Sequence, residues 1–376
     1  MLPESVEHNL DLVEKIVSAV LYEGYILYPY RSSSIKNRQR WNFGVLAPRS
    51  HSEANGDTDA WGMQTECLVR GDQHHAALDV RVRFLHLLAR EIGVPIADCG
   101  MRNADWGGGE NGISLSECDY QVVESLDVGS QRFQSWQEAV EREVSLTGVK
   151  LCDLVARPNR QPFAFESNRE TEVLRDPDDQ VVGLIVRRQG FIKGEVELTA
   201  EQVGSDLYKL TVRVLNLTPL DEGIRNPQSA IRNWRSRDEV LLGSLVSAHT
   251  VLGVRGGDGE FVSLLDPPED CRIQAAACAN AGTWPVLVGE EGARDLMLSS
   301  PIILYDYPQV APESAGNLFD GMEIDEILTL RILTLTDEEK REMRGVDEHA
   351  RRLLERTETL PPEQMMKLHG AMKSKR

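Results

Sequence analysis

A two-residue alternation of apolar and polar side chains constrains the fold of this chain more than any other feature. Apolar residues alternate with charged ones from Leu78 to Phe84, and the stretch from Leu207 to Leu217 contains the same period. Successive side chains of a β-strand point to opposite faces, so the alternation predicts strands with one buried face. Short apolar runs bounded by Gly, Pro or polar clusters predict further strands, at 65–70, 120–128, 140–151, 163–166, 181–187 and 194–199.

The fold class that these runs indicate is α+β and β-rich. The strands between 163 and 217 follow one another closely, which is typical of antiparallel sandwiches and barrel-like sheets. An N-terminal helix is expected over 5–20, where apolar residues recur at helical spacing. A helical C-terminal region is expected as well, because Thr336 and Glu339 fit a capping box for a helix that runs to about Arg356.

The periodicity between these regions predicts mixed elements. Residues 87–92 suggest a short helix that ends the alternating strand, and 229–247 a longer helix. The sequence VLGVRGGDGEFVSLL (251–265) predicts a hairpin whose glycine-rich turn adopts positive φ angles. Short strands are expected at 285–289 and 301–305.

The length of 376 residues predicts two or three domains. A proline-punctuated stretch, ARPNRQPF (156–163), suggests a boundary, and the pattern becomes mixed after Thr218-Pro219. We therefore expect an N-terminal β-rich domain over 1–157, an antiparallel module over 158–220 and a mixed α/β region over 221–376. The periodicity leaves open whether the first two are continuous.

Charge and composition limit the partners. The net charge of −19 argues against nucleic acid, whose binders usually present a basic face. No apolar run approaches the roughly 18 residues that span a bilayer, and no secretory signal pattern is evident, which predicts a cytoplasmic protein. The six cysteines include no CxxC pair, so we expect reduced, mostly buried thiols.

A basic and aromatic segment stands out against this acidic background. No Asp or Glu occurs from Gly24 to Ser52, whereas five cations do. Guanidinium groups beside aromatic rings are typical of anion recognition or of interface anchors. The alternative is that they pair with acidic residues of the same chain. The candidate binding residues are Arg31, Lys36, Arg38, Arg40 and Trp41.

An acidic segment forms the opposite feature. Residues 300–328 contain six carboxylates and no Lys or Arg. Three readings are open: a partner-docking surface, a divalent-metal site, or carboxylates that stabilise the start of a helix near 323. The two charged segments could also pair with each other. The candidate contact residues are Asp306, Glu313, Asp320 and Glu323.

Histidines and cysteines give only loose groupings. His74 and His75 follow Cys67, and His249 precedes Cys271 and Cys278, but neither group has the tight paired spacing of a zinc site. A nucleophilic Cys/His pair drawn from the second group would need spatial proximity that spacing does not supply. Since phosphate-loop, dinucleotide-binding, GxSxG and HExxH patterns are also missing, we predict no cofactor.

Several phrases of this sequence resemble a known group of proteins. They are LYPYRSSSIKNRQRWNFGVLAP, FESNRETEVL, SLLDPP, GTWPVLVGEEG and SPIILYDYPQVAPESAGNLFDGMEIDEILTLRILTLTDEEKREM. The chain is similar over most of its length to uncharacterised conserved bacterial proteins associated with uptake nickel–iron hydrogenase gene clusters. The resemblance implies an accessory or assembly role and assigns no catalytic residue.

The leading hypothesis is a non-catalytic accessory protein that binds a protein partner, such as a hydrogenase subunit or maturation factor. The two charged segments would be its contact surfaces. The alternative is a metal-binding protein or hydrolase-like enzyme whose site is built from dispersed Asp, Glu, His and Cys side chains. Its candidate residues are Asp306, Asp320, Glu323, and His249 with a nearby cysteine.

Overall fold

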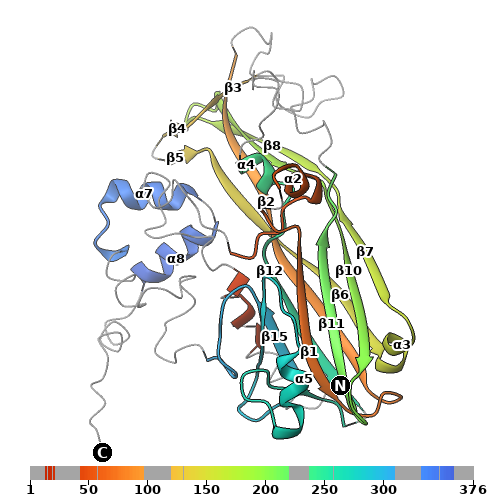
Figure 1. Cartoon of the computed structure of the whole chain (residues 1–376). Helices are drawn as coiled ribbons and strands as arrows, with labels where there is room; N and C mark the ends of the chain where they lie inside the picture. The colour runs from red at the N-terminus through yellow and green to blue at the C-terminus, as the bar shows by residue number, and fades with distance from the viewer. Residues whose placement is uncertain are drawn as a thin grey trace, which may run out of the picture.

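The computed structural model describes residues 13–14, 16–18, 20–21, 43–56, 58–96, 120–129, 131–219, 237–256, 258–309, 332–346 and 348–359. Antiparallel strands dominate these residues, and the helices are few and mostly short (Figure 1). The β-rich α+β class expected from the sequence is therefore confirmed. None of the described helices is both long enough and apolar enough to cross a membrane.

The first layer is a five-stranded sheet in the order β13-β1-β11-β10-β7. Its strand pairs are antiparallel, and β1 and β11 pair in continuous register over nine residues of each strand. The strands are β13 (Glu260–Val262), β1 (Gly62–Arg70), β11 (Leu207–Asn216), β10 (Ile192–Gln202) and β7 (Asn159–Phe165).

The second layer is an eight-stranded sheet in the order β14-β15-β12-β2-β9-β8, with β3 and β6 also paired to β2. A separate two-stranded sheet joins β4 (Ser125–Val128) to β5 (Gln131–Gln134). The eight strands are β14 (Trp284–Leu287), β15 (Leu296–Ser300), β12 (Val246–Arg255), β2 (Ala77–Pro95), β9 (Val181–Gln189), β8 (Asn168–Arg175), β3 (Tyr120–Val123) and β6 (Trp136–Lys150).

The 19-residue strand β2 is the spine of the second sheet. On one side it pairs with β12 along 77–85 and then with β9 along 88–93. On its other side β6 pairs along 77–90 and β3 along 92–95. The predicted helix at 87–92 is wrong, because pairing on both sides keeps this stretch extended.

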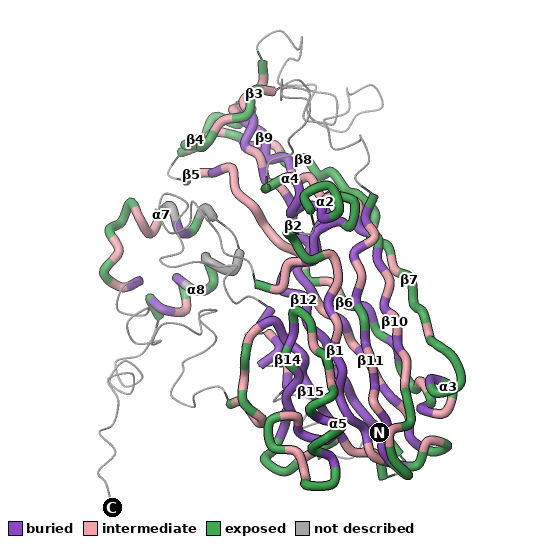
Figure 2. The backbone as a smooth tube through the Cα atoms, in the orientation of Figure 1, coloured by how far each residue is buried: buried purple, intermediate pink, exposed green. Residues whose placement is uncertain are grey.

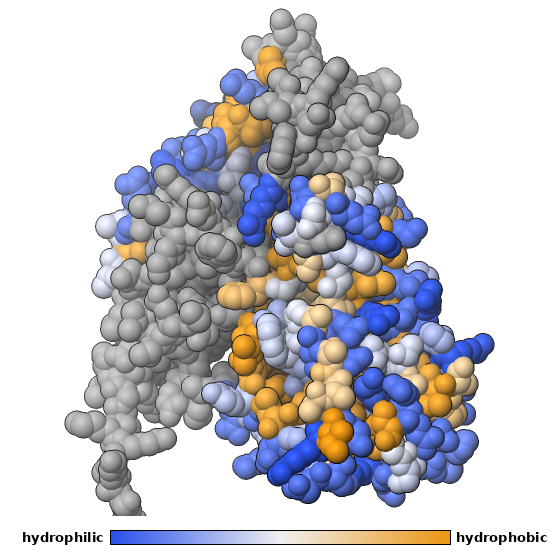
Figure 3. Space-filling model, in the orientation of Figure 1, coloured by the Kyte–Doolittle hydropathy of each residue, from blue (hydrophilic) through white to orange (hydrophobic). Residues whose placement is uncertain are grey.

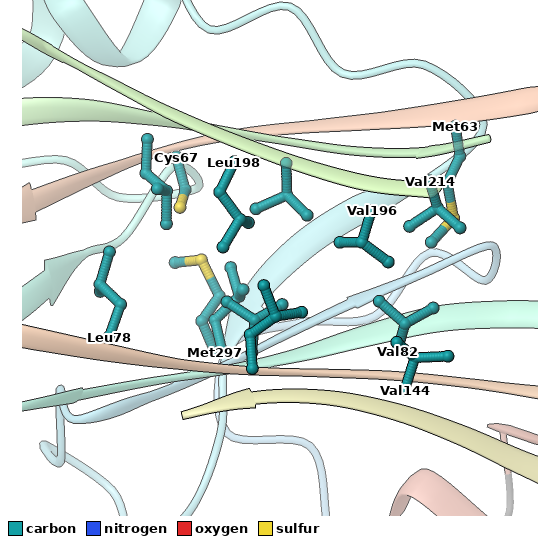
Figure 4. Packing of buried hydrophobic residues seen from close by; sticks show 14 of the residues in the cluster. Met63, Cys67, Leu78, Val82, Val144, Val196, Leu198, Val214 and Met297 are labelled. Atoms are coloured by element: carbon teal, nitrogen blue, oxygen red, sulfur yellow. The ribbon is translucent and has the colours of Figure 1, made fainter. Parts of the chain in front are cut away.

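The main hydrophobic core lies between the two sheets. Val80, Val82 and Phe84 of β2 are fully buried in it, together with Leu210 and Val214 of β11. Figure 4 shows side chains from both layers meeting in this core, and Figure 2 shows that the buried residues follow the strands. Each such side chain contributes about 1.5–3 kcal/mol of hydrophobic stabilisation. The alternation read from the sequence thus identifies the core-facing residues, although the described pairing does not confirm a closed barrel.

Helices and short helical turns cover the sheets. The described helical residues between 13 and 21 pack against Val251 of β12 and Val286 of β14, which confirms this part of the predicted N-terminal helix. The other helices are α2 (Arg49–Ala54), α3 (Leu151–Ala156), α4 (Arg237–Leu241), α5 (Arg272–Ala276), α7 (Asp337–Val346) and α8 (Glu348–Glu358).

The predicted capping box is confirmed at the start of α7. The backbone N–H of Thr336 donates to Glu339 Oε2 at 2.7 Å, and that of Glu339 donates to Thr336 Oγ1 at 3.3 Å. The helix does not continue to Arg356 as expected, because α7 ends at Val346 and α8 begins at Glu348. The two helices pack against each other, joined by an ion pair between Arg344 and Glu358 at 2.7 Å.

Three other sequence predictions differ from the structure. The 251–265 hairpin is wrong: β12 and β13 belong to different sheets, although Gly256 and Asp258 have the expected positive φ angles. A helix is expected over 229–247, but in the described part of this range only α4 is helical. The end of the range belongs to a strand, since Val246 pairs with Leu85 of β2. A strand is expected at 301–305, but the strand in this region, β15, ends at Ser300.

Hydrogen bonds connect all parts of the chain that the sequence suggested as domains. Each of the two large sheets contains strands from 1–157, from 158–220 and from 221–376. Strand β7, which begins within the proline-punctuated stretch, pairs with β10 over seven residues. Pairing in both sheets therefore links residues that lie far apart in the sequence.

Gly194 in β10 provides a sensitive test of the sandwich. A β-carbon at this position would lie 2.2 Å from Cζ of Phe163 and 2.6 Å from the carbonyl oxygen of Leu215. Because the Leu215 oxygen belongs to the backbone of the neighbouring strand, it cannot turn aside. We expect Gly194→Ala to lower the free energy of unfolding by about 1–3 kcal/mol, measured by urea denaturation.

The matched control is Gly253→Ala in β12. A β-carbon there would meet its nearest neighbour, Cδ2 of Leu296, at 3.4 Å, which is an ordinary contact. Equal urea midpoints for the two variants would contradict the packing described at Gly194.

Candidate partner-binding surface

The segment 301–307 runs from the end of β15 along the free edge of β14. Ile302 and Leu304 pack against the cluster that contains Val286 of β14. The backbone N–H of Tyr307 donates to the carbonyl of Leu287 at 2.8 Å. The segment is therefore fixed to the sheet although it is not itself a strand.

Asp306 supplies a second attachment. Its Oδ1 accepts a hydrogen bond from the backbone N–H of Leu287 at 2.8 Å, and its Oδ2 accepts one from Ser263 Oγ at 2.5 Å. Ser263 Oγ in turn accepts from the backbone N–H groups of Leu265 and Asp266. Both oxygens of this predicted docking carboxylate are thus engaged within the fold, and Asp306 holds the segment in place.

Two large side chains project from this fixed segment. Ile303 is 73% exposed and Tyr305 is 86% exposed, whereas their neighbours Ile302 and Leu304 pack inward. Trp284, which pairs with Ser300 just before the segment, is 44% exposed. Figure 3 shows hydrophobic residues among hydrophilic ones on the face around β14, β15 and α5. Exposed apolar residues grouped on a rigid backbone are typical of interaction sites.

Described residues on either side of the basic candidate residues 31–41 reach the same region. A β-carbon at Gly44 would lie 2.6 Å from Cγ of Pro301, so these two residues are in contact. The hydrophobic cluster that contains Leu21 also contains Ile332, and Val45 packs against it. Described residues before and after 31–41 therefore lie against described residues before and after 313–323.

Most of the predicted contact residues lie outside the part of the chain that the structure describes. This applies to Arg31, Lys36, Arg38, Arg40, Trp41, Glu313, Asp320 and Glu323. Arg49, at the end of the basic run, is described: it pairs with Glu53 at 2.7 Å and lies over the Trp61 ring at 4.6 Å. Arg49 thus pairs with an acidic residue of the same chain, as the alternative interpretation of the basic segment predicts.

The histidines and cysteines do not assemble into a metal site within the described ranges, where no group of three His, Cys, Asp or Glu side chains could hold an ion. His75 instead pairs with Asp72 at 2.5 Å. The Nδ1–H of His249 donates to the carbonyl of Ser247 at 2.8 Å. A pairing of His249 with Cys271 or Cys278 therefore has no support among these contacts.

The described thiols of the core are not activated. Burial, the main cause, raises the pKa of the Cys67 thiol above its ordinary value. Burial also raises the pKa of the Cys278 thiol to about 11. The Sγ of Cys271 accepts a hydrogen bond from Arg70 Nη2 at 3.1 Å, yet burial still raises its pKa. Because the thiolate is the reactive and metal-binding form, these cysteines behave as buried apolar side chains.

The sequence analysis did not identify Ile303, Tyr305 or Trp284 as functional residues. The apolar run at 301–305 predicts a strand, and that pattern carries no information about which of its side chains remain uncovered. A signal was present in the flanking prolines, Pro301 and Pro308, since Pro is disfavoured inside a sheet.

Comparisons with known proteins do not assign this chain to a family. The similarity to hydrogenase-associated proteins stays a prediction, and the function is inferred from the chain itself. No protein-family model and no curated protein matches this chain.

Proposed function

We propose that this protein is a non-catalytic accessory protein that binds a protein partner through the surface around Ile303 and Tyr305. The observation that carries the proposal is the high exposure of these two side chains on a segment fixed by Asp306 and Tyr307. Aromatic and aliphatic anchors of this kind contribute most of the binding energy in many interfaces. Since the segment is held to the sheet, little conformational entropy is lost when a partner covers it.

The two charged segments are proposed as further contacts of the same partner. The contact between Gly44 and Pro301, and the shared cluster of Leu21 and Ile332, support a composite interface that includes both segments. Opposite charges at the rim of an interface act mainly on the rate of encounter and on specificity. We therefore expect association that weakens as salt increases.

The partner that we propose is a cytoplasmic hydrogenase subunit or maturation factor. This choice rests on the resemblance of phrases such as GTWPVLVGEEG to hydrogenase-associated proteins. A protein of this role forms a stoichiometric complex and needs no cofactor of its own.

The test is affinity purification of the tagged full-length chain from its native host at low salt, with identification of partners by mass spectrometry. The wild-type chain is expected to retain a hydrogenase subunit or maturation factor in stoichiometric amount. The double variant Ile303→Ser/Tyr305→Ser should lose most of it, because each truncated anchor residue costs about 2 kcal/mol or more of binding.

Val122→Ser is the matched control, because Val122 in β3 is 45% exposed and lies outside the face around β14, β15 and α5. Equal recovery of the partner with the double variant and with the control would contradict the assignment of the surface. Metal analysis of the same samples addresses the alternative: an equimolar metal in a solitary protein would support a metal-binding function and overturn the accessory one.

A further inference from the structure

The spine strand β2 changes its neighbour beside His86. Strand β12 pairs with β2 up to Leu85, and β9 pairs with it from Leu88 onward. His86 lies between these two pairings and is fully buried. His86 is thus an ionisable residue at the position where the pairing partner of β2 changes from β12 to β9.

Arg142 of β6 lies on the same face of the sheet, next to the end of the main core. It pairs with Phe84 of β2, and its guanidinium carbon lies 4.8 Å from the centre of the Phe165 ring. Its Nη2 donates to Oε1 of Gln189 at 3.1 Å. The contact with the Phe165 ring and the hydrogen bond to Gln189 restrict the orientation of the guanidinium group.

No carboxylate of the described residues pairs with Arg142. Two nearby arginines on this face are compensated, because Arg90 and Arg187 share the carboxylate of Glu138 at 3.4 and 2.8 Å. Within the described ranges Arg142 makes no ion pair, and its polar contact is to the neutral Gln189. A half-buried cation without an anion is unfavourable in a folded protein, because burial removes the hydration of the charge.

Two buried N–H groups here have no hydrogen-bond partner in the described structure. They are Nε–H of Arg142 and Nε2–H of Gln189. Backbone groups of Gly190 and Leu242 approach the His86 ring and favour its protonation, but burial and Arg142 outweigh them and lower its pKa to about 4. His86 is therefore neutral at pH 7, and its ring lies beside the backbone groups of Gly190 and Leu242.

We propose that Arg142 and Gln189, beside the neutral ring of His86, form a binding site for the oxyanion group of a small ligand, a carboxylate or a phosphate. The bound group would neutralise Arg142 and accept hydrogen bonds from its Nε–H and from the Gln189 amide. Guanidinium groups held in a fixed plane recognise both kinds of oxyanion through paired hydrogen bonds. This site is independent of the partner-binding surface around Ile303 and Tyr305.

The experiment is isothermal titration of the full chain with inorganic phosphate and, separately, with succinate, at constant ionic strength maintained with sodium chloride. Saturable binding with one site per chain is expected for at least one of them. Phosphate alone would identify phosphorylated ligands, succinate alone carboxylate ligands, and both would define a general oxyanion site. Binding of neither would overturn the proposal.

Variants locate the site. Arg142→Gln is expected to weaken binding at least about tenfold, the effect of losing one charged hydrogen bond. Arg160→Gln is the matched control, because Arg160 of β7 already pairs with Glu197 at 3.0 Å and is exposed. If both variants lost the same amount of anion affinity, the change in net charge would explain the effect, and the assigned site would be refuted.

A second variant keeps the test valid if Arg142→Gln unfolds. Gln189→Ala removes the amide donor and leaves every charge in place, and it should weaken binding of the same anion several-fold. Unchanged affinity in folded Gln189→Ala together with unfolded Arg142→Gln would count against the proposal. Urea denaturation of each variant in the absence of anion separates the loss of folding from the loss of binding.

Discussion

Acidification from pH 7 to pH 4 is expected to destabilise the fold through two buried histidines, His86 and His249. Burial is the main cause that lowers the pKa of each to about 4, and nearby Arg142 and Arg83, respectively, lower it further. The usual histidine pKa near 6.5 applies to the unfolded chain. Between these values the unfolded state binds protons that the folded state does not, so the free energy of unfolding decreases as the pH falls.

The size of this effect follows from the width of the pH window. Above pH 6.5 both states are neutral at these positions and the full stability is present. Each histidine then removes up to about 1.4 kcal/mol per pH unit, or roughly 3 kcal/mol in total, before its contribution levels off below pH 4. Two such groups account for a large fraction of the usual 5–15 kcal/mol stability of a protein.

His249 illustrates why protonation is resisted. The imidazole is fully buried, and its Nδ1–H donates to the carbonyl of Ser247 at 2.8 Å. Its Nε2 has no hydrogen-bond partner in the described part of the chain. Ser247 itself has a positive φ of 53°, at an irregularity in the β12–β2 pairing. A proton on Nε2 would create a buried charge beside Arg83, which explains the lowered pKa.

Urea denaturation at pH 7, 6, 5 and 4 measures the prediction. His249→Gln and His86→Gln should each flatten the decline of stability over this range, because a neutral side chain replaces the titrating one. His75→Gln is the control, since the ring of His75 lies at the surface beside Asp72. An identical decline in all three variants and the wild type would refute the role of the buried rings.

Replacement of Glu138 by glutamine is expected to cost about 3–5 kcal/mol of stability. The carboxylate lies between two guanidinium groups, 3.4 Å from Arg90 Nη1 and 2.8 Å from Arg187 Nε. Arg90 is only 6% exposed, so its charge depends on the protein rather than on water for compensation. Removing one partner of a buried ion pair leaves the other charge desolvated, which is costlier than removing both.

Glu172→Gln is the matched control for this second prediction. Glu172 also pairs with Arg187, at 3.1 Å, but its side chain is 58% exposed, and exposed pairs contribute about 0–1 kcal/mol. The free energy of unfolding of each variant, from urea denaturation at pH 7, provides the comparison. Similar losses for both glutamates would show that burial does not govern this network.

The local pattern of the sequence was sufficient for much of the secondary structure. The alternation from Leu78 to Phe84 identified both a strand and its buried face. The Thr336–Glu339 capping box and the positive φ angle of Gly256 were also predictable. Each of these features is determined by residues within a few positions of one another, because side-chain alternation, helix capping and turn geometry are local properties.

Sheet membership, exposure and charge pairing depended on the tertiary structure. The sequence of 251–265 predicts two strands and a turn, but the pairing of β13 with β1 and of β12 with β2 places them in opposite layers. The apolar run at 301–305 does not reveal which side chains stay uncovered. The spacing around Arg142 does not reveal that this cation has no ion-pair partner among the described residues. These features arise from contacts between residues far apart in the chain, which local periodicity does not encode.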